Sequence, residues 1–223
     1  MEKVSTKAED SVSSLMSQGK IVQITCYGRS TFERIAKSIE CQKHRELIDY
    51  IRQYAYRHSK KNLYKTYGLV DTNEDLMAYI SFSLSSIDND KKLKDETDIP
   101  SSITYPISAL EITRLLVSDK FKKQGLGTQL LNLADILAFV IAHQVGCKLI
   151  IVYAKSEAEN FYAKKHFKTL KADEENTVLM FKIVEEDIPS DLLEQYIEFC
   201  NLFSLQSLKT YLNAIKPTNP KKP

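Results

Sequence analysis

Residues 122–127 form a short stretch whose composition suits the binding of a phosphate group. They read Lys-Lys-Gln-Gly-Leu-Gly and lie between a predicted strand and a long predicted helix. Glycines let the backbone approach a ligand closely, and the first amides of a helix have no partner inside the helix. These amides and the positive end of the helix dipole attract phosphate. The two lysines add charge beside this helix start, so we expect a phosphate-bearing ligand, with a plain turn as the alternative.

Two other phosphate-binding loops are excluded by the residues that follow. A dinucleotide fingerprint needs a third glycine where Leu130 stands, and an acidic residue about twenty positions further on. A P-loop needs Gly-Lys-Ser/Thr, whereas Gly127 is followed directly by Thr128.

The elements around this loop predict a crossover between two neighbouring strands. Residues 110–117 read as a strand, residues 128–145 as a helix that ends at Gly146, and residues 148–153 as a nearly all-apolar strand. Because a strand this apolar is usually covered on both faces, we expect a mixed or parallel sheet flanked by helices.

The rest of the chain supplies further strands and helices in an α/β (α+β) pattern. A first strand is expected at residues 21–27, helices at 31–39 and 46–57, a hairpin at 65–70 and 76–84, and a long exposed loop at 88–102. Ser156 to Glu159 matches a capping box that starts a short helix. Strands at 167–170 and 177–184 follow, then two amphipathic helices.

The length of 223 residues fits one domain with an appendage. We expect a flexible segment at residues 1–20, the main domain at 21–186, a C-terminal helical extension at 187–215 and a disordered tail at 216–223, which is rich in proline and lysine.

Composition argues against several classes of protein. Hydrophobic residues make up 43% and charged residues 27%, which is typical of a globular protein, and the net charge of +2 does not by itself indicate nucleic acid. The four cysteines lie far apart, so neither a metal site nor a disulfide framework is expected. No signal peptide is expected, and polar residues interrupt the most apolar stretch, 130–154, so we expect a cytoplasmic protein without a membrane span.

Three features occur together in an order that points to one family: Leu115-Leu116-Val117, then Lys122-x-x-Gly125-x-Gly127 before the helix and apolar strand, and finally Ala158-x-x-Phe161-Tyr162. In this combination the chain resembles the GNAT superfamily of acetyltransferases over roughly residues 21–184. The resemblance implies a mixed, centrally splayed sheet flanked by helices. The family motif begins with Arg or Gln, and Lys122 keeps the charge but loses the fork geometry of arginine.

The same resemblance implies acetyl-CoA as co-substrate. Its pyrophosphate would bind the loop amides, and its pantetheine arm would pair with the first strand of the crossover. The residues implied in cofactor binding are Leu115, Val117, Lys122, Lys123, Gln124, Gly125, Leu126, Gly127, Thr128 and Asn160.

Family resemblance also places Tyr162 beside the coenzyme sulfur, as a proton donor to the departing thiolate. A phenol with a pKa near 10 is protonated at neutral pH; a core aromatic is the alternative. Glu111 could act as a base through water, but an exposed edge carboxylate is an equal alternative, and a bulge in this strand would change which way it faces. Without an evident base, the sequence favours an α-amino acceptor, which is partly unprotonated at neutral pH.

Within the superfamily, the run Arg114-Leu115-Leu116-Val117-Ser118-Asp119 and the later Tyr153-Ala154-Lys155 resemble the toxin branch of bacterial toxin–antitoxin pairs. Those toxins acetylate aminoacyl-tRNA, so tRNA and an antitoxin protein become expected partners, and a homodimer stays open. His166-Phe167 departs from the usual Gly-Phe pair, and the C-terminal helices are additional to the minimal domain.

The segment 43–65 mixes basic residues with tyrosines, a combination that suits a nucleic-acid backbone and exposed bases. Arg114 and, from this segment, Arg52, Arg57, Lys60 and Lys61 are the expected substrate-binding residues. A solvated helix face and a surface ion pair are the alternatives. A small-molecule or protein amine, or a degenerate fold used only for binding, are the competing functions; retention of Gly125, Gly127 and Tyr162 argues for activity.

Overall fold

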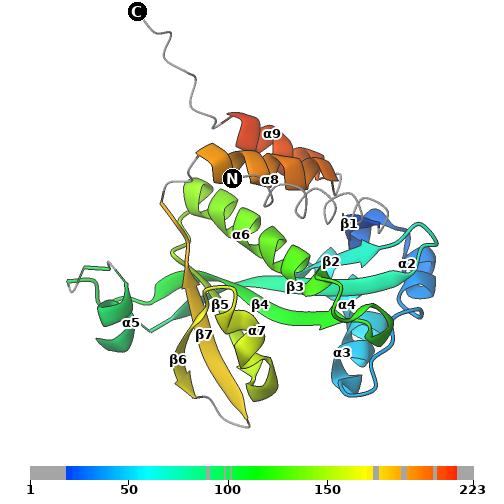
Figure 1. Ribbon diagram of the computed structural model, residues 1–223, viewed down its shortest axis with the longest axis horizontal. Helices are drawn as coiled ribbons and strands as arrows, with labels where there is room; N and C mark the ends of the chain where they lie inside the picture. The colour runs from blue at the N-terminus through cyan, green and yellow to red at the C-terminus, as the bar shows by residue number, and fades with distance from the viewer. Residues whose placement is uncertain are drawn as a thin grey trace, which may run out of the picture.

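Seven strands form one mixed sheet, with helices on both faces (Figure 1). The computed structural model describes residues 19–88, 91–97, 99–100, 102–172, 176–186, 190–202 and 205–214. The spatial order of the strands is β1-β2-β3-β4-β5-β7-β6, and every neighbouring pair is antiparallel except β4 and β5, which are parallel. The strands are β1 (Lys20–Gln23), β2 (Lys65–Val70), β3 (Leu76–Ile87), β4 (Ile107–Val117), β5 (Leu149–Lys155), β6 (Lys168–Ala172) and β7 (Thr177–Ile183).

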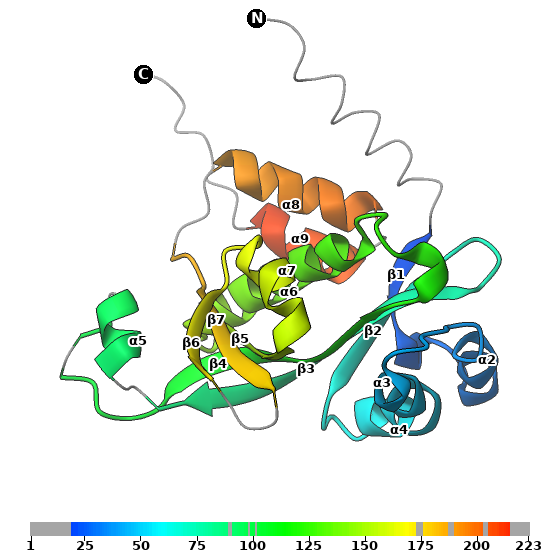
Figure 2. The same ribbon diagram turned by 60° about the horizontal axis from the view of Figure 1, so that its bottom comes forward.

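The two parallel strands separate halfway along their length. Residues 109–112 of β4 pair with residues 149–152 of β5, but beyond these residues the two strands continue without pairing with each other (Figure 2). On the other side of β4, Ser81 is opposite Arg114 and Phe82 is opposite Ile112, so Thr113 is an extra residue. Such a bulge bends and twists its strand. The central splay expected from the sequence is therefore present, and so is a bulge in this strand.

One face of the sheet is covered by α6 (Leu126–Gln144), with α8 (Ser190–Leu202) and α9 (Gln206–Ala214) lying over that helix (Figure 1). Cys200 of α8 and Leu212 of α9 are fully buried in the same core cluster as α6. The length and apolar composition of α6 would also fit a membrane span, and its packing in this core accounts for its apolar side chains. The C-terminal helices thus extend the main core.

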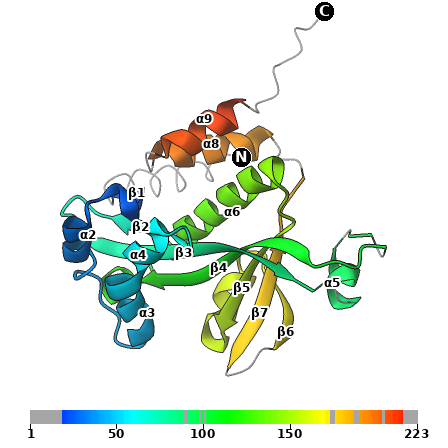
Figure 3. The ribbon, with the colours of Figure 1, turned by 180° about the vertical axis from the view of Figure 1, so that it is seen from behind.

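The opposite face is covered in two separate places (Figure 3). At the β1–β3 end, apolar side chains of the helices pack on Tyr79 and on Leu116 of β4. At the β5–β7 end, Leu93 packs in a cluster with Phe181 and with Ala109 of β4. Between these two clusters, the side chains that β4 presents on this face of the sheet are polar. We call this face the divided face. Its helices are α2 (Arg29–Ile35), α3 (Arg45–Asp49), α4 (Ala55–Lys60) and α5 (Lys91–Glu96).

Residues 45–60 form one helical segment that contains a π turn at Tyr50–Tyr54. In an α-helix, residues eight apart are about 80° apart around the axis. The π turn absorbs one extra residue, which moves Tyr50 and His58 onto the same side of the segment. The sequence predicted a helix here but not this turn.

Three local predictions were wrong. The first strand ends at Gln23, where a 3-10 turn begins. The expected loop 88–102 contains α5, because Leu93 anchors this polar segment in the core. The expected capping box is absent: Ser156 donates instead to the Asn176 carbonyl (2.8 Å), and Glu159 accepts from Thr169 (2.8 Å). The tail at 216–223 and residues 1–18 lie outside the described residues.

Candidate active site

The loop before α6 has the backbone shape that its glycines predict. Gly125 is the N-cap of α6 and has φ of +79°, in the left-handed region that side chains with a Cβ rarely adopt. No side chain caps this helix start. The first amides of α6 are therefore left for a ligand, beside the exposed side chains of Lys123 and Gln124.

Gly127 brings three parts of the site together. A Cβ at this position would lie 3.1 Å from the ring of Phe161 in α7 (Glu159–Ala163) and 3.7 Å from the Val117 side chain at the end of β4. The next residue toward the N-terminus, Leu126, is buried and anchors the loop in the core. A side chain at Gly127 would therefore require the Phe161 ring to shift.

Lys122 and Asp119 form an ion pair at 2.5 Å at the entrance to this loop. Asp119 also accepts a hydrogen bond from the Gln42 amide (2.9 Å). The hydrogen bond to Asp119 raises the pKa of Lys122 above its usual value, so the ammonium remains charged at neutral pH. The first residue of the motif therefore supplies a positive charge with a fixed anchor.

The remaining predicted cofactor residues lie around the same opening. Leu115 and Val117 are half-buried and pack against the core cluster on the α6 side of β4. Thr128 is half-buried in the first turn of α6, and Asn160 is exposed on α7. The structure therefore brings the predicted cofactor residues to one side of β4.

Tyr162 is buried in α7, with its ring packed edge-on against Phe161 and Phe167 at centroid distances of 5.1 and 5.4 Å. Its hydroxyl makes no hydrogen bond with any residue that the structure describes. Burial raises the pKa of Tyr162 above the usual value for a phenol, because the charged phenolate would lose its hydration. Tyr162 is therefore protonated at neutral pH, and its proton has no internal acceptor among the described residues.

The loop 40–44 connects the two separated strand ends. The Glu40 amide donates to Ser118 Oγ (3.2 Å), just after β4. Glu157, just after β5, pairs with Lys43 and with His44 Nε2 (3.0 Å). These contacts tether the ends of β4 and β5 on either side of the opening.

On the divided face, the polar part of β4 contributes Glu111, Thr113 and Arg114, all half-buried. Glu111 forms no ion pair with the residues that the structure describes. Strand alternation directs Glu111 away from α6, since Leu110 and Ile112 belong to the α6 core. The bulge at Thr113 then lets Arg114 face the same side as Glu111.

Arg114 stacks on an aromatic side chain of the π turn. Its guanidinium carbon lies 3.7 Å from the ring centroid of Tyr50 and 5.5 Å from that of Tyr64. The His58 ring lies 5.5 Å from Tyr64. The sequence pointed to Arg114 and to the tyrosines, but gave no signal for His58, because only the π turn and the sheet bring these rings together.

The predicted substrate-binding residues of segment 43–65 fall into two groups. Arg52 turns inward and donates to the carbonyls of Ala36, Lys37 and Ile39 at the end of α2 (3.2, 2.9 and 2.9 Å), so its guanidinium has a structural role. The other three predicted side chains are exposed and form no ion pair with the described residues: Arg57, Lys60 and Lys61.

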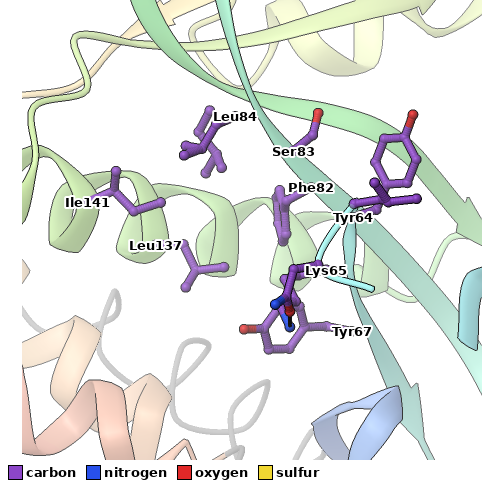
Figure 4. A pocket seen from close by; sticks show the side chains of 11 residues that line it. Tyr64, Lys65, Tyr67, Phe82, Ser83, Leu84, Leu137 and Ile141 are labelled. Atoms are coloured by element: carbon purple, nitrogen blue, oxygen red, sulfur yellow. Dashed lines mark hydrogen bonds between the residues drawn. The ribbon is translucent and has the colours of Figure 1, made fainter. Parts of the chain in front are cut away.

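An apolar pocket of about 410 Å³ lies elsewhere, beside the second half of α6 (Figure 4). Its wall includes Phe82, Leu84, Leu137 and Ile141, and also Tyr64, whose ring lies 5.5 Å from the Arg114 guanidinium carbon. None of the predicted site residues lines this pocket. The predicted site residues therefore lie apart from this pocket.

Comparison with known families identifies the domain that contains this site. Residues 90–169 match the family model described as acetyltransferase (GNAT) domain. The matched stretch includes β4, the glycine loop, α6, β5 and α7. This stretch of the chain is therefore similar to a GNAT acetyltransferase domain. GNAT enzymes transfer an acetyl group from acetyl-CoA to an amine, and the open splay and uncapped helix start of this GNAT domain fit that cofactor.

Solved structures share the fold of this GNAT domain. A Tyr-to-Phe mutant of KacT is 20% identical, covers 75% of this chain and 95% of its own, and has a TM-score of 0.62. A Tyr-to-Phe mutant of the toxin AtaT, bound to the C-terminus of the antitoxin AtaR and acetyl-CoA, is 17% identical and has a TM-score of 0.59. The match covers 74% of this chain and 92% of the AtaT chain. AtaT complexed with acetyl-methionyl-tRNAfMet is 19% identical and has a TM-score of 0.56; the match covers 72% of this chain and 90% of the AtaT chain. The fold is therefore shared with such toxins, in line with the resemblance seen in the sequence.

Proposed function

We propose that this GNAT domain acetylates the α-amino group of aminoacyl-tRNA. The observation that carries the proposal is the divided face, where half-buried polar residues of β4 lie beside the splay and next to exposed cations and tyrosines. A small amine would need no basic surface around its site, whereas an RNA acceptor needs one. AtaT, which shares the fold, has been solved with acetyl-methionyl-tRNAfMet.

Acetyl-CoA would bind on the α6 side of β4. The amides of residues 124–128 would hold its pyrophosphate, with Lys122 and Lys123 adding positive charge. Backbone groups of residues 113–117 on the side of β4 toward β5 are left without a strand partner, because pairing with β5 ends at Ile112. These groups are suited to hydrogen-bond the pantetheine arm.

Acetyl-CoA supplies a thioester, whose carbonyl carbon bonds to the amine nitrogen while its bond to sulfur breaks. Tyr162 donates its hydroxyl proton to the departing sulfur and regains a proton from water. The raised pKa of Tyr162 keeps the hydroxyl protonated before each turnover. The amine loses one proton to a water molecule, and we propose that Glu111 accepts the proton from this water.

The absence of a strong base supports an α-amine as acceptor. Glu111 is the one carboxylate among the described residues of β4, and it has no partner that would orient it. A lysine amine with a pKa near 10.4 is almost wholly protonated at pH 7, whereas an α-amine with a pKa near 8 is partly free. An enzyme without a strong base therefore favours the α-amine.

The C-terminal end of α4 would contact the RNA. Arg57 lies 5.9 Å from the ring of Tyr54, which is 41% exposed, and Lys60 and Lys61 are the next cations along the chain. Exposed aromatic rings stack on unpaired bases, and nearby cations neutralise phosphates. Such an arrangement suits the single-stranded end of a charged tRNA.

As partners we propose an antitoxin protein in addition to tRNA, because AtaT binds the antitoxin AtaR in a solved structure. Charged tRNA is cytoplasmic, so the proposal includes a cytoplasmic location. A homodimer remains compatible with it.

Label transfer from radiolabelled acetyl-CoA tests the proposal. Purified protein is incubated with charged tRNA, uncharged tRNA, polyamines and protein lysates. We expect label in charged tRNA far above the other acceptors, released together with the amino acid after mild base. Label in polyamines or proteins but never in tRNA would mean that the acceptor is one of these amines and not aminoacyl-tRNA. Binding of acetyl-CoA without any transfer would indicate a binding module.

A further inference from the structure

Arg114 is a half-buried cation without a charged partner in the described part of the chain. It forms no ion pair and no hydrogen bond with the residues that the structure describes. Its contacts are the rings of Tyr50 and Tyr64, at 3.7 and 5.5 Å from the guanidinium carbon. A partly buried cation usually gains a carboxylate or a ligand, since lost hydration is costly.

The stacked arrangement leaves the donors of Arg114 available. Contact with a ring uses the flat face of the guanidinium, while its five N–H groups lie in the plane and point outward. The two tyrosines therefore fix the side chain and leave its hydrogen-bonding edge free. This geometry suits a planar oxygen acceptor such as a carbonyl or carboxylate.

Two further polar atoms in the same cluster lack partners. The Tyr50 hydroxyl and His58 Nδ1 are buried and make no hydrogen bond with the described residues, and Tyr50 as a whole is only 4% exposed. The His58 ring contacts Tyr50, Tyr54 and Tyr64 at centroid distances of 5.9, 6.0 and 5.5 Å. Nearly all buried polar groups in native structures have a partner, so these two atoms call for a water molecule, an ion or a ligand.

His58 does not compete with Arg114 as a cation. Burial lowers the pKa of His58, and the charges of Arg57, Arg114 and Lys61 lower it further. The imidazole is therefore neutral at pH 7, and Arg114 is the fixed positive charge of the cluster.

The position of the cluster along β4 relates it to the reacting centre. Ile112 is the last residue of β4 that pairs with β5. Arg114 lies two residues further along the strand, directly after the bulge residue Thr113. An amine that enters the splay from the divided face therefore has its neighbouring atoms next to Arg114. In an α-aminoacyl group, the carbonyl is separated from the amine by a single carbon.

We propose that Arg114, held against the rings of Tyr50 and Tyr64, binds the carbonyl oxygen beside the attacking amine and so selects α-aminoacyl acceptors over amines that lack this carbonyl. The inference rests on the proposed function, because it assumes an α-amine as acceptor. It adds the residue that distinguishes an aminoacyl group from a simple amine. A site built around a substrate oxygen discriminates strongly against analogues without it, since its own donors are then unpaired.

The test compares matched acceptors in the full-length protein. Leucine methyl ester and 3-methylbutylamine share a side chain, and only the ester has the carbonyl; free leucine distinguishes a carboxylate from an ester. Charged tRNA is assayed in parallel. The amines differ in basicity, but this difference is the same for every enzyme variant, so the ester-to-amine ratio of kcat/KM isolates the role of the side chain.

We expect Arg114→Met to lower kcat/KM for the ester and for charged tRNA by about 10- to 100-fold, and to lower the ester-to-amine ratio by a similar factor. Arg114→Lys keeps the charge but should recover little, because the fork is lost. Tyr50→Phe, which removes one hydroxyl, should lower the ratio by a smaller factor. Arg34→Met, at an exposed arginine of α2, is the matched control and should change nothing.

The outcomes separate this inference from the proposed function. An unchanged ratio in Arg114→Met, with acetyl-CoA affinity intact by calorimetry, overturns the role of Arg114 while charged tRNA can still be the acceptor. An equal loss on ester and amine also overturns it and makes Arg114 structural. If wild-type protein acetylates 3-methylbutylamine but neither ester nor charged tRNA, the proposed function itself fails.

Discussion

The two sides of β4 are built in different ways. On the α6 side, the predicted cofactor residues come from one stretch of chain, from the end of β4 through the glycine loop to α7. On the divided face, Arg114 meets Tyr50 and His58 from the π-turn segment and Tyr64 from the turn before β2. The first site depends on backbone conformation, and the second on side chains brought together by packing.

This difference indicates how each side can vary. A backbone site made of amides and glycines tolerates few substitutions but binds the same cofactor whatever the acceptor. A side-chain site can change with single substitutions while the sheet is unchanged. We therefore expect acetyl-CoA binding to depend on the loop, and acceptor choice to depend on the divided face.

The largest effect is expected from replacing Gly125 and Gly127 together by valine. Gly125 has φ of +79°, and a side chain at Gly127 would approach Phe161 to 3.1 Å, so the loop cannot keep its shape. Acetyl-CoA binding should become undetectable by calorimetry.

Gly28→Val is the matched control for the double variant. Gly28 has an extended φ of −64° and no atom within 4 Å of an added Cβ, so this variant should bind normally. Undiminished affinity in the Gly125/Gly127 variant would mean that the cofactor binds elsewhere.

The next effect is expected from Tyr162→Phe, which removes only the hydroxyl. Turnover should fall by about 10²-fold, the contribution of one general acid, while acetyl-CoA affinity stays the same. Tyr105→Phe, at an exposed tyrosine, should leave turnover unchanged.

The pH profile gives a second measurement of the same role. Burial raises the pKa of Tyr162, so the acid form persists and wild-type kcat should remain level from about pH 8 to at least about pH 9.5. At lower pH, kcat/KM should decline as the acceptor amine becomes protonated. Equal turnover of the Tyr162→Phe variant and wild type would make this tyrosine purely structural.

The smallest effect is expected from reversing Lys60 and Lys61 to glutamate. The KM for charged tRNA should rise on the order of tenfold, and the dependence of this KM on salt should become less steep, because fewer counterions are released on binding. Acetyl-CoA affinity and small-amine acetylation should not change.

Lys91→Glu with Lys92→Glu, on exposed α5, is the control of equal charge. The same rise in KM in the control would show a general effect of charge. It would mean that the KM does not report tRNA binding at the divided face. An unchanged KM in the Lys60/Lys61 variant would remove this end of α4 from the proposed interface.

The sequence alone determined the crossover, the mixed sheet and the position of the glycine loop. These features rest on local signals: apolar periodicity, the glycines at 125 and 127, and the order of elements around them. The hairpin strand at Lys65–Val70 had the predicted bounds. Local predictions failed where a single contact decided the outcome. Examples are Leu93, which anchors α5, and Ser156, whose hydroxyl donates to the carbonyl of Asn176.

Only the tertiary structure decided which side chains of the basic segment face the acceptor. Arg52 and Arg57 have the same charge and lie in one helical segment, yet Arg52 caps the end of α2 and Arg57 is exposed beside Tyr54. The register of the π turn and the bulge at Thr113 place Tyr50, His58 and Arg114 in one cluster. Neither irregularity leaves a signal in the sequence, because each is stabilised by packing against elements that lie far away along the chain.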